Sequence, residues 1–217
     1  MFVDHLAFLA KRIRQDGLPL YVIGHSMGSF LTQRFVQKYP ELVDKAVIVG
    51  SNGPNILFGL GNLVAALTVW PSNRDNESKL LAALSIGAYA KSIKNAVTSA
   101  DWLSYNEENV QKFLLDPLDG GPSAKGFYRE LLRGTSRLYK KRHYKLVPRD
   151  LPLFIIAGED DPVGAKGKGV KKLHKMYKRL GFSNVSMKLY VKMRHEILNE
   201  TNREQVYNDV LMFLKGK

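Results

Sequence analysis

A strand that runs directly into a helix constrains the fold more than any other part of the sequence. The apolar run Leu20–Ile23 is typical of a buried strand and leads into Gly24-His25-Ser26-Met27-Gly28, after which a helical pattern continues to Pro40. A serine on such a sharp turn is exposed at the end of the strand, where a base can reach its hydroxyl. The glycines two residues before and after Ser26 are expected to relieve the crowding of a strained backbone. The junction therefore predicts a nucleophilic serine, with the backbone N–H of Met27 facing a developing oxyanion.

Apolar runs and helical patterns alternate along the rest of the chain. The further runs are Ala46–Val49, Leu153–Ala157 and Val185–Val191. The helical patterns extend from Phe2 to near Asp16-Gly17, from Gly169 to Leu180 and from Arg203 to Leu214. Buried strands that alternate with amphipathic helices predict an α/β fold, in which a mostly parallel sheet is flanked by helices on both faces.

A long segment, residues 54–150, separates the second and third apolar runs and shows no clear strand. Its helical patterns cover Leu80–Lys94, Val110–Leu115 and Gly126–Tyr139. A structureless loop of this length would be unusual in a compact domain. We therefore expect a helical cap of residues 54–150, inserted into a single domain of residues 1–217 whose core is formed by residues 1–53 and 151–217.

Two other parts of this cap can be interpreted from the sequence. The apolar segment Ile56–Trp70 has helical spacing and is expected to be a buried cap helix. Alternatively, this segment lines an acyl-chain pocket or inserts into a lipid interface. Asp101-Trp102 is expected to supply turn or capping residues.

A serine nucleophile of this kind needs an acid and a base, in the chain order serine, acid, histidine. The run Leu153–Ala157 ends in a loop with the adjacent carboxylates Glu159, Asp160 and Asp161. Open α/β sheets build their sites at such carboxyl ends of strands. Three neighbouring carboxylates repel one another, so at least two of them are expected in a solvated turn. Spacing alone leaves open which of the three faces the site.

The candidates for the base are His5, His25, His143, His174 and His195. His5 and His25 precede or adjoin the serine, and His25 is expected to point away from it. His143 belongs to a basic segment of the cap, and His174 shares a helix face with lysines, where we expect it to be exposed. His195 follows the last apolar run, in a loop that can return over the serine. Chain order and topology therefore favour His195.

Three motifs in this order resemble those of α/β-hydrolases of the serine aminopeptidase-like group, which includes monoacylglycerol lipases and lysophospholipases. They are Gly24-His25-Ser26-Met27-Gly28-Ser29, Ile156–Val163 and Arg194–Glu200. The resemblance implies Ser26 as nucleophile, His195 as base and Asp161, three residues after the strand-ending glycine, as acid. It implies hydrolysis of acyl esters such as monoacylglycerols or lysophospholipids through an acyl-enzyme, with neither a metal nor a cofactor.

One part of the family pattern is missing from this sequence. In the family several strands precede the serine turn, and a loop after an early strand carries a His-Gly motif that supplies the second oxyanion N–H. Here a single helical pattern precedes Leu20, and no His-Gly pair occurs. Loss of one oxyanion donor lowers turnover by about 100- to 1,000-fold. We therefore expect an N-terminally shortened sheet with the exposed apolar edge Leu20–Ile23, and a catalytically impaired remnant is an alternative to a working hydrolase.

Positive charge is concentrated in the second part of the chain. Residues 1–124 hold 11 basic and 11 acidic side chains, whereas residues 125–217 hold 22 basic and 9 acidic ones, which is the whole net charge of +13. Between Lys166 and Arg179 seven basic residues alternate with an apolar stripe, a pattern typical of a solvated helix face. The segment Arg133–Arg149 combines basic residues with Tyr139 and Tyr144, a composition that suits an anionic membrane surface or a nucleic acid.

These observations define the expected partners. We expect an acyl ester or lipid as substrate, with an anionic membrane surface as a second option, and neither a nucleic acid nor an obligate protein partner. A basic module that binds membrane surfaces and only retains the hydrolase fold is a further alternative to the enzyme. The chain has no cysteine, which excludes disulfides and suits a reducing compartment. A cytoplasmic location, with peripheral membrane contact as an option, is the corresponding expectation.

Overall fold

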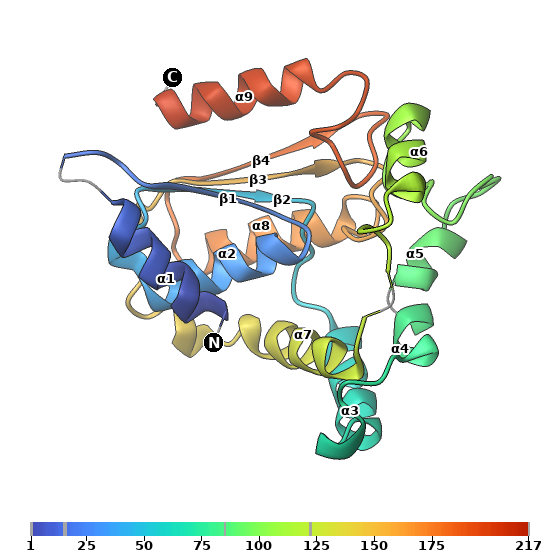
Figure 1. Cartoon of the computed structure of the whole chain (residues 1–217). Coiled ribbons are helices and arrows are strands. Elements are labelled where there is room, and N and C mark those ends of the chain that lie inside the picture. The colour runs from blue at the N-terminus through green and yellow to red at the C-terminus, as the bar shows by residue number, and fades with distance from the viewer. Residues whose placement is uncertain (1, 15–16, 85, 122, 217) are drawn as a thin grey trace.

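A parallel sheet lies at the centre of the molecule (Figure 1). The computed structural model describes residues 2–14, 17–84, 86–121 and 123–216. In these residues the sheet has four strands in the order β1-β2-β3-β4, and all neighbouring strands are parallel. The strands are β1 (Tyr21–His25), β2 (Lys45–Val49), β3 (Leu153–Gly158) and β4 (Val185–Tyr190). The predicted parallel α/β sheet is therefore confirmed.

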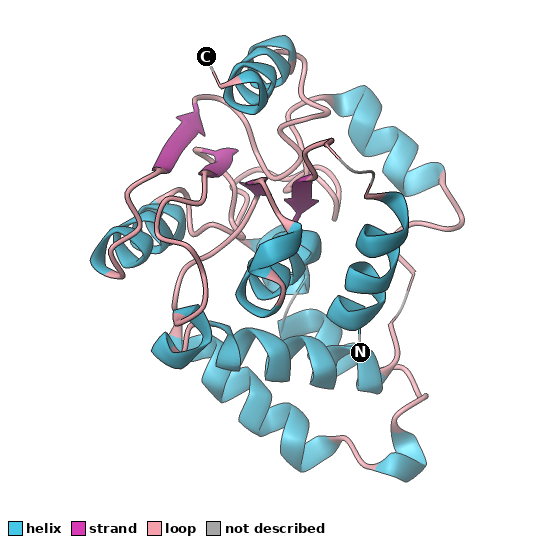
Figure 2. Cartoon of the chain, turned by 90° about the vertical axis from the view of Figure 1, so that its left-hand side faces the viewer, coloured by secondary structure: helices cyan, strands magenta, loops and turns pink. Residues whose placement is uncertain are grey.

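Helices cover both faces of this sheet, as Figure 2 shows. They are α1 (Phe2–Ile13), α2 (Met27–Lys38), η1 (Pro40–Leu42), α8 (Lys168–Arg179) and α9 (Glu204–Lys215). In β2, Ala46 and Ile48 belong to an apolar cluster with α1, α2 and α8, whereas Val47 and Val49 belong to a cluster with α9. Successive side chains of a strand point to opposite faces, so a strand that is apolar at every position needs cover on both.

The segment between β2 and β3 holds helices and one isolated β-bridge, between Glu77 and Ala124, in the described residues. The elements are α3 (Ile56–Thr68), η2 (Pro71–Asn73), α4 (Lys79–Leu84), α5 (Ile86–Lys91), α6 (Glu107–Leu115), α7 (Lys125–Leu138) and η3 (Lys141–Tyr144). The helix predicted over Leu80–Lys94 corresponds to α4 and α5, which lie on either side of residue 85, and residue 85 is outside the described residues. Asp16, where the sequence predicts the end of the first helix, also lies outside them.

α3 is exposed, so the prediction of a buried cap helix over Ile56–Trp70 is wrong. Within α3 only Ala65 is buried, while Ile56 is 79% exposed and Leu67 is 65% exposed. Its main neighbour is α7, which it approaches closely at Gly61, where an added Cβ would lie 2.9 Å from Leu132 Cδ2. Phe58 of α3 also meets Phe30 of α2 edge to face. In the described part of the chain, no helix is both long and apolar enough to cross a membrane.

β1 forms one edge of the sheet and leaves apolar side chains exposed. Tyr21 is 36% exposed and Ile23 is 49% exposed, as expected for the run Leu20–Ile23. The nearby helix α1 packs on α2 through its smaller apolar residues, Val3, Ala7 and Ala10. Its larger apolar residues, Phe2, Leu6, Leu9 and Ile13, remain exposed.

β1 and α2 are packed closely at Gly24. An added Cβ at this glycine would lie 2.2 Å from Thr32 Oγ1 and 2.3 Å from the Gly28 carbonyl oxygen, both on α2. These distances are far below van der Waals contact, so the close approach needs a residue without a side chain. An added Cβ at Gly28 meets nothing within 4 Å. The expectation that both glycines relieve crowding is right for Gly24 and wrong for Gly28.

This difference predicts opposite effects of the same substitution. Gly24→Ala should lower the free energy of unfolding by about 1–3 kcal/mol, because the strand and helix must move apart. Gly28→Ala should leave it unchanged or raise it by up to about 1 kcal/mol, because alanine favours the helix. Urea unfolding followed by circular dichroism measures both values. Equal destabilisation by the two substitutions would contradict the close packing at Gly24.

Candidate active site

Ser26 lies on the sharp turn between β1 and α2. Its backbone is in the left-handed region, with φ 54° and ψ −119°, which is strained for a residue with a side chain. The Ser26 N–H donates to the Val49 carbonyl of β2 at 3.0 Å, and the Ser26 carbonyl accepts from Ser29 N–H at 2.9 Å. These bonds hold the turn at the carboxyl end of the sheet. α2 begins at Met27, whose N–H belongs to the first helical turn and has no acceptor inside the helix.

Asp161 and His195 form a buried pair beside this turn. Asp161 is fully buried and His195 is 1% exposed. His195 Nδ1 lies 3.1 Å from both Asp161 Oδ1 and Oδ2, and Asp161 Oδ1 also accepts from Val163 N–H at 2.8 Å. A carboxylate in such a site stabilises the protonated imidazole and holds Nδ1–H toward itself.

The other two carboxylates of the loop after β3, Glu159 and Asp160, do not contact His195. Glu159 is exposed. Asp160 is half-buried, and its Oδ2 accepts a hydrogen bond from Tyr105 Oη at 3.0 Å. Of the three acids that spacing leaves open, the structure brings Asp161 next to His195.

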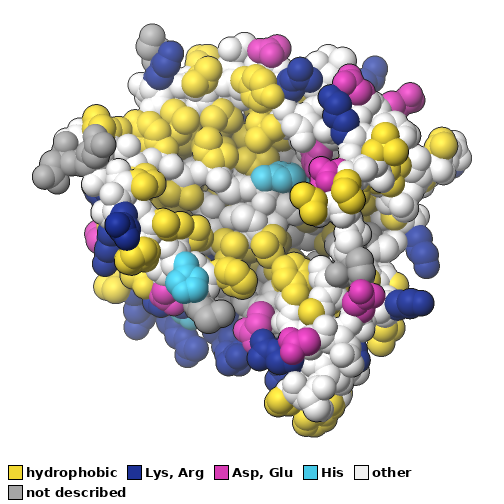
Figure 3. All heavy atoms as spheres, viewed as in Figure 1, with side chains coloured by type: hydrophobic (Ala, Val, Ile, Leu, Met, Phe, Trp, Pro, Cys, Tyr) yellow, Lys and Arg dark blue, Asp and Glu magenta, His cyan; other side chains and the backbone are white. Residues whose placement is uncertain are grey.

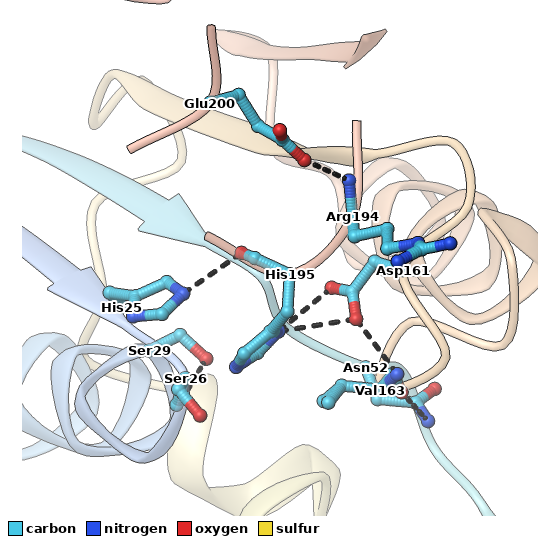
Figure 4. Close-up of polar contacts among 9 residues, drawn as sticks. All are labelled: His25, Ser26, Ser29, Asn52, Asp161, Val163, Arg194, His195 and Glu200. Atoms are coloured by element: carbon cyan, nitrogen blue, oxygen red, sulfur yellow. Dashed lines mark hydrogen bonds and ion pairs between the residues drawn. The ribbon is translucent and has the colours of Figure 1, made fainter. Parts of the chain in front are cut away.

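The second ring nitrogen of His195 is oriented toward the serine turn. Figure 4 shows the imidazole between the Asp161 carboxylate and Ser26. The Nε2 atom is buried and has no hydrogen-bond partner among the described residues. A buried polar atom without a partner is costly in a folded protein. An Nε2 that faces a serine on a strained turn is the arrangement needed to accept a proton from an attacking hydroxyl.

A second imidazole, that of His25, supports the loop of residues 191–203, which carries His195 and which we call the histidine loop. His25 Nε2 lies 3.0 Å from the His195 carbonyl oxygen, so Nε2 carries the proton, and the two ring centroids are 4.5 Å apart. Burial lowers the pKa of His25, which favours its neutral form. Gly50 leaves room for both rings, since an added Cβ would lie 3.1 Å from His195 Cε1 and 3.2 Å from His25 Cδ2. His25 is thus directed to the backbone of the loop that carries His195.

Residues 101–109 hold the histidine loop from the other side. The Trp102 ring lies 5.1 Å from the His195 ring, between centroids. Glu200, which is 2% exposed, accepts from Arg194 N–H at 2.8 Å and from Tyr105 N–H at 3.0 Å. Glu196 N–H donates to the Leu103 carbonyl at 2.7 Å. These contacts fix the position of His195 through the segment between β2 and β3.

The sequence does not reveal that Trp102 packs against His195. Asp101 does act as the expected turn residue, because its carboxylate accepts from Val97 N–H at 2.7 Å and from Thr98 Oγ1. Trp102 instead covers the catalytic candidate His195. No local motif marks that role, since the contact joins residues that are distant in the sequence.

The remaining histidines lie away from Ser26. His5 is exposed on α1, and His143 is half-buried in η3, where burial lowers its pKa. His174 is half-buried rather than exposed as predicted, because its Nε2 lies 3.3 Å from the Val185 carbonyl oxygen at the start of β4.

Comparisons with known proteins agree with this geometry. Residues 1–202 match the family described as serine aminopeptidase, S33. The chain is 25% identical over 203 residues to a monoacylglycerol lipase of Mycolicibacterium smegmatis, in a match that covers 91% of this chain and 62% of the lipase. It is 23% identical over 217 residues to phospholipase YtpA of Bacillus subtilis, covering 98% of this chain and 74% of the phospholipase. This chain therefore spans less than two thirds of the lipase.

Solved structures show the same fold. A thermostable carboxyl esterase from Bacillus coagulans, in complex with glycerol, superposes with a TM-score of 0.89 at 22% identity, covering 99% of this chain and 70% of the esterase. A lipase in an open form gives a TM-score of 0.83 at 24% identity, covering 98% of this chain and 70% of the lipase. The family match extends over most of the residues, and the chain belongs to the serine aminopeptidase S33 family of α/β-hydrolases.

Proposed function

We propose that this chain is a serine hydrolase that cleaves carboxylic acyl esters through an acyl-enzyme. The buried Asp161–His195 pair carries the proposal, because its unpartnered Nε2 faces Ser26 (Figure 4). The names of the relatives, a monoacylglycerol lipase and a phospholipase, support acyl esters as the substrate class. Monoacylglycerols and lysophospholipids are the substrates we infer within this class.

In the first half of the proposed reaction, Ser26 Oγ attacks the carbonyl carbon of the ester. His195 Nε2 takes the hydroxyl proton, and Asp161 stabilises the resulting imidazolium through Nδ1–H. Negative charge develops on the carbonyl oxygen, and the Met27 N–H at the start of α2 is the donor we assign to it. Collapse of the tetrahedral intermediate breaks the ester bond, and His195 returns its proton to the leaving alcohol.

In the second half, water replaces the alcohol. His195 takes a proton from the water, which attacks the acyl carbon, and the fatty acid leaves as Ser26 recovers its proton. The acid, the base and the nucleophile all come from this chain.

We also propose the division of the chain into a core of residues 1–53 and 151–217 and a cap of residues 54–150. The helices α3 to α7 lie within the second part, and residues 101–109 bind the histidine loop. A cap with these contacts supports the base directly, in addition to shaping the substrate site.

The nucleophile and base can be tested together. Ser26→Ala and His195→Ala should each lower turnover of a short-chain p-nitrophenyl ester by about 10⁴-fold or more, because members of a triad act as a unit. The control variants Ser183→Ala and His5→Ala change exposed residues of the same types and should retain wild-type rates. Full activity in Ser26→Ala would contradict the assignment. No hydrolysis by the wild-type chain would favour a catalytically impaired remnant instead.

The acid can be tested with its neighbour as the control. Asp161→Asn should lower turnover by about 10⁴-fold, because the amide cannot stabilise the imidazolium and favours the wrong tautomer. Asp160→Asn removes a carboxylate that contacts Tyr105 rather than His195, and turnover should stay within about twofold of wild type. Steady-state kinetics measures both, and a larger loss in Asp160→Asn than in Asp161→Asn would overturn the choice of acid.

A further inference from the structure

A basic groove lies between α8 and the end of α7. It has a volume of about 770 Å³ and is lined by six cationic side chains: Lys141, Lys168, Lys171, Lys172, Lys175 and Arg179. Among the residues that the structure describes, no acidic side chain lines this groove. Two segments that are separate in the sequence meet here, since Lys141 belongs to Arg133–Arg149 and the other five belong to Lys166–Arg179. Figure 3 shows Lys and Arg side chains gathered beside the C-terminal end of α7.

These cations carry unbalanced charge. In the part of the chain that the structure describes, none of the six has an ion-pair partner, although other lysines and arginines do. The five from α8 recur at three- and four-residue spacing on one helix face, where like charges four residues apart destabilise a helix. Bound anions would remove this repulsion, so the groove fits a ligand with several negative groups.

The groove opens beside an exposed apolar surface. Pro54 lines it, and α3 starts two residues later with Ile56 and Leu57, which are 79% and 63% exposed. In Figure 1, α3 runs from this point toward the bottom of the molecule, where Figure 3 shows apolar side chains. Exposed apolar patches of this kind mark interaction surfaces. Cationic and apolar side chains next to one another match the headgroup and acyl boundary of a membrane.

The aromatic residues of this region do not serve a nucleic acid. Base recognition by a basic segment uses aromatic faces for stacking. Tyr144 is 1% exposed and packs against Tyr177 and Phe182, and Tyr139 is half-buried with its hydroxyl bonded to the Asn52 carbonyl. Tyr144 therefore belongs to the interior, and Tyr139, which also lines the groove, is held in place through its hydroxyl.

We propose that this groove, together with the N-terminal end of α3, docks the protein on an anionic phospholipid surface. The six cations bind lipid phosphates, while Ile56 and Leu57 insert at the acyl boundary. The site is separate from Ser26, so docking does not require ester hydrolysis.

Vesicle binding tests the docking site in the Ser26→Ala background, where lipid cleavage does not interfere. Cosedimentation is measured with vesicles of equal parts phosphatidylglycerol and phosphatidylcholine, and with phosphatidylcholine alone. We expect binding to the first only, weakened by salt. Lys171→Glu with Lys175→Glu should weaken it by at least about 25-fold, since each basic residue near such a surface contributes about fivefold. Ile56→Gln should weaken it by about tenfold at low salt.

A matched control has the same charge change outside the groove. Lys91→Glu with Lys94→Glu alters two exposed lysines that do not line it, and binding should stay within about fivefold of the parent. Thermal unfolding of every variant confirms that it is folded. Equal losses in the two double variants, or no loss in Ile56→Gln, would overturn the proposal. Tighter binding to a single-stranded RNA than to the anionic vesicles, lost in the groove variant, would also overturn it.

Discussion

The hydrogen bond between Asp161 and His195 lies in the protein interior, where both side chains are shielded from bulk solvent. A fully buried carboxylate is costly unless its oxygens find donors, and Asp161 finds them in His195 Nδ1 and Val163 N–H. The loop after β3 and the loop after β4 must therefore lie at a fixed separation. Because β3 and β4 are parallel neighbours, both loops leave the sheet at the same edge, and the pairing follows from the topology.

Other parts of the structure maintain this pair. Gly24 lets β1 and α2 meet closely enough to form the turn that carries Ser26, and Gly50 leaves space for the rings of His25 and His195. Glu200 and Trp102 attach the histidine loop to residues from the segment between β2 and β3. The position of His195 thus depends on elements from three distant parts of the chain. Removal of any one of these contacts should therefore lower activity by more than the loss of that contact alone would explain.

Some parts of this arrangement can be predicted from the sequence, and others cannot. β2 and β3 are recognisable because strands covered on both faces contain continuous apolar runs, here Ala46–Val49 and Leu153–Ala157. The serine turn is recognisable because it joins a strand to a helix. The choice of Asp161 among three acids came from a family resemblance, since local spacing does not reveal which carboxylate a loop directs inward. The exposure of α3 and the contact of Trp102 with His195 could not be predicted, because both depend on tertiary packing against residues far along the chain.

Covalent labelling shows whether the buried Asp161–His195 pair activates Ser26. A fluorophosphonate reacts much faster with a serine whose proton a neighbouring base can remove than with an unactivated serine. Intact-protein and peptide mass spectrometry of the treated chain should show a single adduct on Ser26, which is absent when His195→Ala is treated in the same way. An adduct on another serine, or equal labelling of Ser26 with and without His195, would mean that this pair does not activate Ser26.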